Sequence, residues 1–145
     1  MSQYKVSEHF FIYEFVPKVI FDRYDLKSKW FIRPEIIKLA QFYRNYFGRP
    51  VYINNWYWGG PRYNRGFRTP NSQVGVLYSQ HKLGAAFDCN IQGISPDEVR
   101  SEIMANATAF MDAGLTTLED GAIATTWIHS DIRPTGLSEI LIVGG

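Results

Sequence analysis

The sequence has little cysteine and almost no net charge. Cys89 is the single cysteine in 145 residues, so no disulfide can form within the chain and the fold does not depend on an oxidising compartment. The formal net charge is +1 at neutral pH, which argues against nucleic acid as the main partner. Arg62, Arg65 and Arg68 form the one basic cluster worth testing in that respect.

Long apolar segments are absent as well. No run of about twenty apolar residues occurs, which excludes a membrane span. Residues 1–9 have neither the apolar segment nor the cleavage site of a signal peptide, so we expect a cytoplasmic protein that something else delivers to any outside substrate. With 46% hydrophobic and 20% charged residues, the chain can bury one core. A single domain over residues 1–145, without repeats or linkers, is expected to act as a monomer.

Two longer helices are predicted. Apolar residues at helical spacing predict the first from Pro34, ending at Gly48, and we expect it to cover the sheet. Ser95 begins a Ser-Pro-Asp-Glu helix start, and this second helix is predicted to end at Gly114. A short capped helix is expected over residues 7–15, whereas the mixed polar segment 19–30 is expected to be a connection.

Short strands are predicted near residues 51–54, 85–90, 115–118 and 123–132, with a last strand at 140–143. Residues 119–121 are expected to form a tight turn that joins the third and fourth strands into a hairpin. Because helices and strands do not alternate strictly, the fold class is predicted as α+β, with a small, mostly antiparallel sheet flanked by helices.

Residues 55–78 form a long segment of glycine, proline, asparagine, arginine and aromatic residues without periodicity. Such a segment is unusual inside a compact domain and is typical of a functional loop. Its aromatic residues Trp56, Tyr57 and Trp58 have two interpretations. They either cover an open edge of the core or form a platform for a sugar ring or a peptide.

Two segments carry residues that suit a metal ion. His81 and Asp88 stand on either side of Gly84, where the chain can turn sharply, and strand alternation directs Asp88 away from the apolar face of its strand. Later in the chain, His129 and Asp131 share one strand face. His81, Asp88 and His129 make a three-ligand set with a fourth position left for water, as in catalytic zinc sites. The alternative is two ordinary surface or core histidines.

Three motifs, in order, resemble those of one enzyme family. They are Arg65 to Pro70, Ser79 to Asp88, and Trp127 to Asp131, and together the resemblance spans roughly residues 30 to 135. The chain resembles the zinc D-Ala-D-Ala carboxypeptidases and the related peptidases among phage endolysins. The resemblance implies a Hedgehog/DD-peptidase-like fold, a Zn²⁺ ion held by His81, Asp88 and His129, and bacterial peptidoglycan peptide as the substrate.

The resemblance also implies roles for residues around the metal. Arg68 occupies the position of an arginine that relatives use to bind a substrate carboxylate or carbonyl, although it could instead form a loop salt bridge. Ser79 and Gln80 are expected to hold the loop by hydrogen bonds, and Gln80 could reach the substrate. Together with Trp127, these residues form the expected substrate-binding group.

One position departs from the family pattern. Relatives usually carry Asp or Glu three residues before the second histidine as the general base, and here that residue is Thr126, whose hydroxyl cannot accept a proton near neutral pH. Glu119, Asp120 or Asp131 could take this role. Asp131 could instead orient His129, and the sequence does not rank Glu119 against Asp131.

We therefore expect a zinc metallopeptidase that hydrolyses stem or cross-bridge peptides of peptidoglycan at D-Ala-type bonds. A compact catalytic domain without a signal peptide fits a phage endolysin released to the cell wall, or a lysis module carried in a virion. The alternative is an inactive zinc-binding relative that binds peptidoglycan or serves as a structural virion module, and Thr126 favours it.

Overall fold

A five-stranded mixed sheet forms the centre of the computed structural model, which describes residues 2–76 and 78–144. The strand order is β1-β2-β4-β3-β5. The strands are β1 Val51–Tyr52, β2 Ala86–Ile91, β3 Thr117–Glu119, β4 Ile128–Asp131 and β5 Leu141–Val143. Neighbouring strands are antiparallel except for β3 and β5, which are parallel. The predicted α+β class, with a mostly antiparallel sheet, is confirmed.

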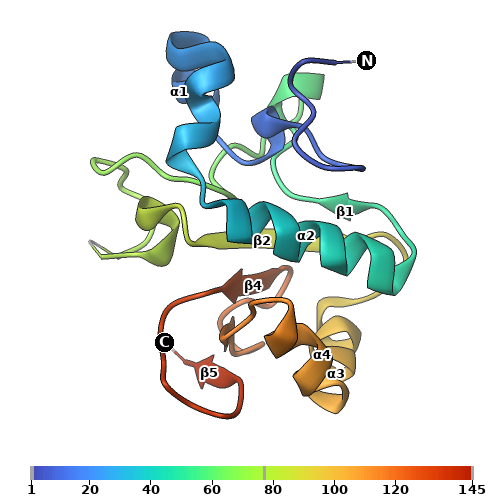
Figure 1. Ribbon diagram of the computed structural model, residues 1–145. Helices are drawn as coiled ribbons and strands as arrows, with labels where there is room; N and C mark the ends of the chain where they lie inside the picture. Colours follow the sequence, from blue (N-terminus) through green and yellow to red (C-terminus); the bar gives the residue numbers. More distant parts are fainter. Residues whose placement is uncertain (1, 77, 145) are drawn as a thin grey trace.

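Helices flank this sheet (Figure 1). The α-helices are α1 Lys18–Tyr24, α2 Pro34–Phe47, α3 Pro96–Ala105 and α4 Ala107–Asp112. Short 3-10 helices are η1 Ile12–Glu14, η2 Asp25–Phe31, η3 Trp56–Trp58 and η4 Gln80–Leu83. The predicted helix from Pro34 is confirmed as α2, and Gly48 ends it in the left-handed conformation with φ 65°.

Helix α2 covers one face of the sheet, in front of β2 in Figure 1. Its buried Tyr43 packs edge-on against Phe87 of β2, with ring centroids 5.3 Å apart. Phe87 and Cys89 alternate along β2 and both lie in the apolar core, as the strand periodicity predicts. Asp88, between them, therefore faces the opposite side of the sheet, where the candidate site lies.

The N-terminal predictions were wrong in two places. Residues 7–15 are not one helix: a bridge joins Lys5 to Phe11, and only Ile12–Glu14 is helical. Segment 19–30 is not a connection but forms α1 and η2. Ile20 is the one buried residue of α1, so this short surface helix lacks the apolar repeat on which a sequence prediction depends.

The predicted helix from Ser95 to Gly114 is broken. Ser95 caps α3 as predicted, because its hydroxyl oxygen accepts a hydrogen bond from the Glu98 N–H. At Asn106 the backbone leaves the helical region (φ −126°, ψ 35°). The Asn106 side chain donates to the Glu102 carbonyl and thereby competes with the helical backbone pattern.

The boundaries of the late hairpin also differ from the prediction. Glu119 lies in β3 rather than in a turn, and β4 begins only at Ile128. Asp120 accepts from the Ala122 N–H through its side chain, which folds the segment before β4 into turns. Glu119 is therefore the last residue of a strand.

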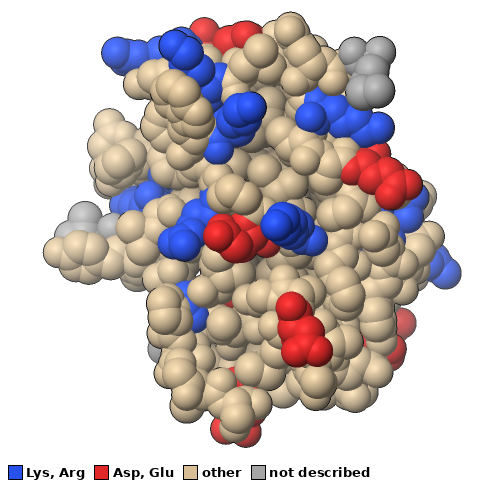
Figure 2. Space-filling view, viewed as in Figure 1, with Lys and Arg blue, Asp and Glu red and all other residues tan. Residues whose placement is uncertain are grey.

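The molecular surface shows no dominant charge on the face over α2. Acidic and basic side chains are interspersed there (Figure 2), in keeping with the net charge of +1. Within residues 2–76 and 78–144, no helix is both long and apolar enough to cross a membrane.

Candidate metal centre

Strand register brings two of the three predicted ligands together. Asp88 of β2 and His129 of β4 are direct antiparallel partners, so their side chains project from the same face of the sheet at neighbouring positions. His81 arrives from η4 through a turn at Gly84, where φ is 67°. A Cβ atom on Gly84 would lie 2.3 Å from the Phe31 carbonyl oxygen, so this close approach requires glycine.

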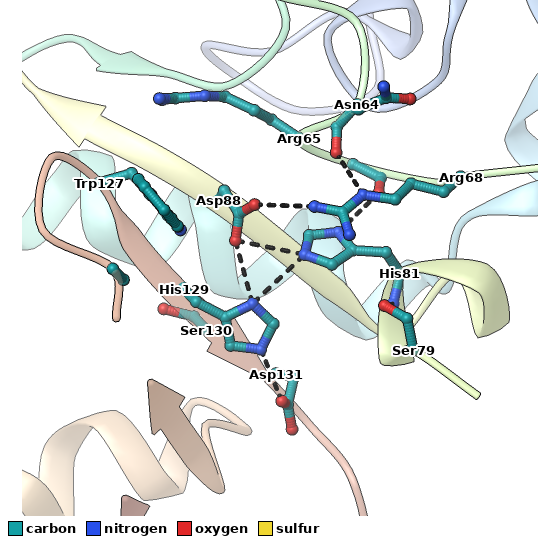
Figure 3. Close-up of polar contacts among 12 residues, drawn as sticks. Asn64, Arg65, Arg68, Ser79, His81, Asp88, Trp127, His129, Ser130 and Asp131 are labelled. Carbon is teal, nitrogen blue, oxygen red and sulfur yellow. Dashed lines mark hydrogen bonds and ion pairs between the residues drawn. The ribbon is translucent and has the colours of Figure 1, made fainter. Parts of the chain in front are cut away.

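The ligand atoms converge in a buried cluster (Figure 3). Asp88 Oδ1 lies 3.2 Å from His81 Nε2 and 3.0 Å from His129 Nδ1, and the two nitrogens are 3.3 Å apart. The residues are only 2%, 6% and 7% exposed for His81, Asp88 and His129. The predicted set of His81, Asp88 and His129 could thus hold a metal ion.

The outer ring nitrogens fix both histidine tautomers. His81 Nδ1 lies 2.8 Å from the Gly66 carbonyl oxygen, and His129 Nε2 lies 2.8 Å from Asp131 Oδ2. A carbonyl and an ionised carboxylate only accept, so both outer nitrogens carry hydrogens. In neutral imidazoles, the inner nitrogens therefore present lone pairs to Asp88. Three acceptor atoms face one another, and a shared proton or metal ion is needed to stabilise them.

The pKa values of His129 and Asp88 are shifted strongly in the cluster. Burial alone would lower the pKa of His129, but its hydrogen bonds to Asp131 and Asp88 and the charges of both outweigh burial and raise the pKa to about 9. Burial alone would raise the pKa of Asp88, but the two histidines outweigh it and lower the pKa. The metal-free cluster therefore favours a bound cation.

Arg68 lies beside the metal ligands. Its Nη2 is 3.2 Å from Asp88 Oδ2, and its Nε donates to the Asn64 carbonyl at 2.8 Å. The Arg68 N–H also donates to the His81 carbonyl, which ties the arginine to the ligand loop. The salt bridge that the sequence left as an alternative does form, but its partner is Asp88, one of the three candidate metal ligands.

A cavity of about 370 Å³ opens over the cluster. All four residues of the expected substrate-binding group line it, namely Arg68, Ser79, Gln80 and Trp127. Ser79 also accepts from the His81 N–H through its hydroxyl oxygen at 3.2 Å, as expected of a residue that holds the loop. Exposed Val76 and Tyr78 add an apolar wall.

The candidate bases occupy different places. Glu119 lines the cavity together with His81, Asp88 and His129. Asp131 is fully buried and is not among the described residues that line the cavity. Its carboxylate accepts from His129 and forms a salt bridge with Arg133. Asp131 therefore has the position of a residue that orients His129.

Neither Asp120, the third candidate base, nor Thr126, at the usual base position, is among the described residues that line the cavity. Asp120 is exposed and its carboxylate accepts from the Ala122 N–H. Thr126 is exposed, and its carbonyl accepts from Asn90 Nδ2 at 2.7 Å. Among the acidic residues proposed as base, Glu119 is the one that shares the cavity with the cluster.

Sequence reasoning missed Arg133 and Gly66. Arg133 lines the cavity and binds the Asp131 carboxylate, and its spacing two residues after Asp131 was the available signal. Gly66 holds His81 through its carbonyl oxygen. A Cβ on Gly66 would lie 2.1 Å from the Phe15 carbonyl oxygen, a contact between distant segments that the sequence does not reveal.

The aromatic loop residues pack mainly on the N-terminal segment. Tyr57 stacks on Tyr13 with ring centroids 3.7 Å apart, and Trp56 Nε1 donates to the Val16 carbonyl. None of the three aromatic residues of η3 is among the described residues that line the cavity over the cluster. This placement agrees with the interpretation that they cover an edge of the core.

Comparisons of the chain with protein-family models, curated proteins and solved structures gave no match. That the chain is related to the zinc carboxypeptidases, as its three motifs suggest, therefore stays a hypothesis. Its support comes from the chemistry of the site.

Proposed function

We propose that the protein is a zinc-dependent peptidase that hydrolyses stem or cross-bridge peptides of bacterial peptidoglycan at D-Ala-type bonds. The observation that carries this proposal is the convergence of His81 Nε2, Asp88 Oδ1 and His129 Nδ1, three atoms that can each direct a lone pair at a shared metal ion. In a tetrahedral zinc site with ligands near 2.0–2.1 Å, ligand atoms are about 3.3 Å apart. The separations of 3.0, 3.2 and 3.3 Å match this geometry.

The donor set favours zinc over other common ions. Imidazole is a poor ligand for Mg²⁺ and Ca²⁺, whereas two imidazoles and one carboxylate suit zinc. Three protein ligands beside an open cavity correspond to a catalytic rather than a structural site. Bound zinc supplies Lewis acidity, which polarises a peptide carbonyl and lowers the pKa of a water molecule to about 7.

Glu119 is the proposed general base. It lies at the end of β3 and lines the cavity with the three ligands. A carboxylate there can take a proton from the attacking water and pass it to the leaving amine. Asp131 acts instead as a positioning residue, because its carboxylate accepts a hydrogen bond from His129 Nε2 and is itself held by Arg133.

Arg68 and the cavity wall bind the peptide. The Arg68 side chain is only 12% exposed, so its charge is poorly screened and can stabilise a substrate carbonyl or carboxylate. Val76, Tyr78 and Trp127 provide apolar surface for small side chains such as alanine. The assignment to peptidoglycan, and to a phage endolysin or virion lysis module, rests on the family resemblance of the motifs.

The direct test is digestion of purified Gram-negative sacculi. With added zinc we expect the turbidity to fall, and a chelator should abolish the fall because it removes the ion. Glu119→Gln should bind sacculi without clearing them. Binding without clearing by the unmodified protein would instead favour the alternative of an inactive peptidoglycan-binding or structural module, which Thr126 at the usual base position supports.

A further inference from the structure

Arg65 lies beside the metal centre but does not belong to it. Its carbonyl accepts from the Asp88 N–H at 2.7 Å, and its own N–H donates to Asn54 Oδ1, so its backbone is fixed next to β2. Its guanidinium Nη1 donates to Asn90 Oδ1 at 2.5 Å. Asp88 and Asn90 are two residues apart on one face of β2, which corresponds to roughly 7 Å along the strand.

Among the described residues, the charge of Arg65 has no carboxylate partner. Arg68 and Arg133 pair with Asp88 and Asp131, whereas in the described part of the chain no carboxylate lies within 4.0 Å of Arg65. Burial lowers the pKa of Arg65 and the nearby charge of Arg62 lowers it further, while the charge of Asp88 opposes this shift. A half-buried guanidinium whose side-chain hydrogen bond goes to the neutral amide of Asn90 retains hydrogen-bonding capacity for an anion.

The surroundings connect Arg65 to the cavity. Asn90 Nδ2 donates to the Thr126 carbonyl, directly before Trp127, which lines the cavity. In Figure 3 the Arg65 side chain passes above Asp88 and ends toward the side on which Trp127 lies, whereas His81 and Arg68 lie on the other side of Asp88. Arg65 itself is not among the described residues that line the cavity, so it can meet only a peptide that extends out of the cavity past Trp127.

We infer that Arg65, held by Asn90, is a carboxylate subsite that selects acidic peptides. This inference rests on the proposed peptidase function. An extended peptide rises about 3.3 Å per residue, so the separation of roughly 7 Å places the recognised carboxylate about two residues from the hydrolysed bond. The planar guanidinium can bind this carboxylate through two parallel hydrogen bonds.

The test uses synthetic peptides that end in D-alanyl-D-alanine and carry a glutamate at successive positions, each paired with its glutamine version. At one position, the zinc-loaded protein should prefer glutamate by about ten- to hundredfold in kcat/KM, the effect of one charge-assisted contact. Arg65→Gln should bring this ratio close to one. Arg62→Gln is the matched control, since it removes a neighbouring charge, and it should change the ratio by less than about threefold.

Asn90→Asp provides a second variant that leaves Arg65 in place. Its carboxylate would pair with the guanidinium and should remove the preference, which keeps the inference testable if Arg65→Gln does not fold. Cleavage of both peptides of every pair at equal rates by the unmodified protein would overturn the subsite, as would an unchanged preference in Arg65→Gln.

Failure of the peptidase proposal can be distinguished from failure of the Arg65 subsite. If no peptide is hydrolysed, the peptidase proposal fails, and calorimetric binding of the same pairs still tests the subsite. Tighter binding of one glutamate peptide, lost in Arg65→Gln, would support it. Equal binding of all pairs would overturn it.

Discussion

His129 Nδ1 lies 3.0 Å from Asp88 Oδ1 because the two residues are direct partners in the antiparallel pairing of β2 and β4. This relationship makes the candidate metal centre depend on strand register, since a slip of one residue would turn one of the two side chains to the opposite face. The buried hydrogen bond between Tyr43 and Ser130, at 2.7 Å, joins α2 to β4 on the strand's other face. The sheet therefore provides a rigid base for two of three ligands.

Loss of any one ligand should remove the metal. His81→Ala, Asp88→Ala and His129→Ala should each abolish stoichiometric zinc binding, because two remaining ligands are too few for a stable site. Equilibrium dialysis followed by elemental analysis measures the zinc content. His9→Ala is the control, since His9 is an exposed histidine bonded to Gln41, and it should retain one zinc per chain. Retention of zinc by two of the three ligand variants would refute the assignment.

Gly84→Ala should destabilise the protein and weaken zinc binding. Gly84 and Gly136 both have positive φ, at 67° and 70°, but only at Gly84 does an added Cβ meet another atom, the Phe31 carbonyl oxygen at 2.3 Å. Backbone strain alone costs about 1 kcal/mol in either variant, so the excess loss in Gly84→Ala measures the close contact. Thermal unfolding and zinc titration of both variants provide the comparison. Equal losses would show that the ligand loop tolerates the extra atom.

Glu119→Gln and Asp131→Asn should separate catalysis from metal binding. Glu119→Gln should lower kcat by two or more orders of magnitude with zinc content unchanged, because it removes the basic oxygen but no ligand. Asp131→Asn should weaken zinc binding by about ten- to hundredfold, because the amide supports the His129 tautomer poorly. Steady-state kinetics with zinc titration measure both. Full activity in both variants would contradict the proposed mechanism.

Thr126→Asp is the converse test of the base. It introduces a carboxylate at the position where the zinc peptidases that its motifs resemble carry one. If Glu119 already acts as the base, this variant should not raise kcat above that of the unmodified protein. An inert unmodified protein that Thr126→Asp activates would establish the binding-module alternative.

The metal-free protein should lose stability as pH rises from about 6.5 to 9. His129 has a folded-state pKa raised to about 9, against about 6.5 in an unfolded chain. Over this window the folded state retains a proton that the unfolded chain has lost, so the stabilisation is complete below pH 6.5 and disappears by pH 9. Thermal melting with chelator should show this decline, His9→Gln should preserve it and His129→Gln should flatten it. Zinc displaces the same proton, so zinc affinity should rise across the window.

The residues of the candidate site were predictable where local patterns carry them. Strand alternation placed Asp88 opposite Phe87 and Cys89, and the spacing of His129 and Asp131 put both on one face. Helix α2 followed from its apolar repeat and Gly48. Contacts between distant segments were not predictable. The bond of His81 to Gly66 and the packing of Gly66 on Phe15 depend on tertiary structure, and no periodicity reports them.

The ranking of the bases also depended on the structure. The turn expected at residues 119–121 left Glu119 without a fixed direction, whereas its pairing with Val143 in the parallel β3–β5 ladder places it at the edge of the cavity. A parallel partner from the end of the chain is a long-range feature that the local sequence around Glu119 does not encode. The short surface helix α1 was not predicted for a local reason. It buries too little apolar surface for its sequence to show a helical repeat.

Anomalous diffraction at the zinc absorption edge, from crystals grown with zinc, would locate the metal ion directly. We predict one strong peak within bonding distance of His81 Nε2, Asp88 Oδ1 and His129 Nδ1, with a remaining coordination position open to the cavity that Glu119 lines. Asp131 should stay bonded to His129 Nε2 and outside the coordination shell. Absence of a peak at this cluster under saturating zinc, or a metal bound through Asp131 instead of Asp88, would contradict this prediction.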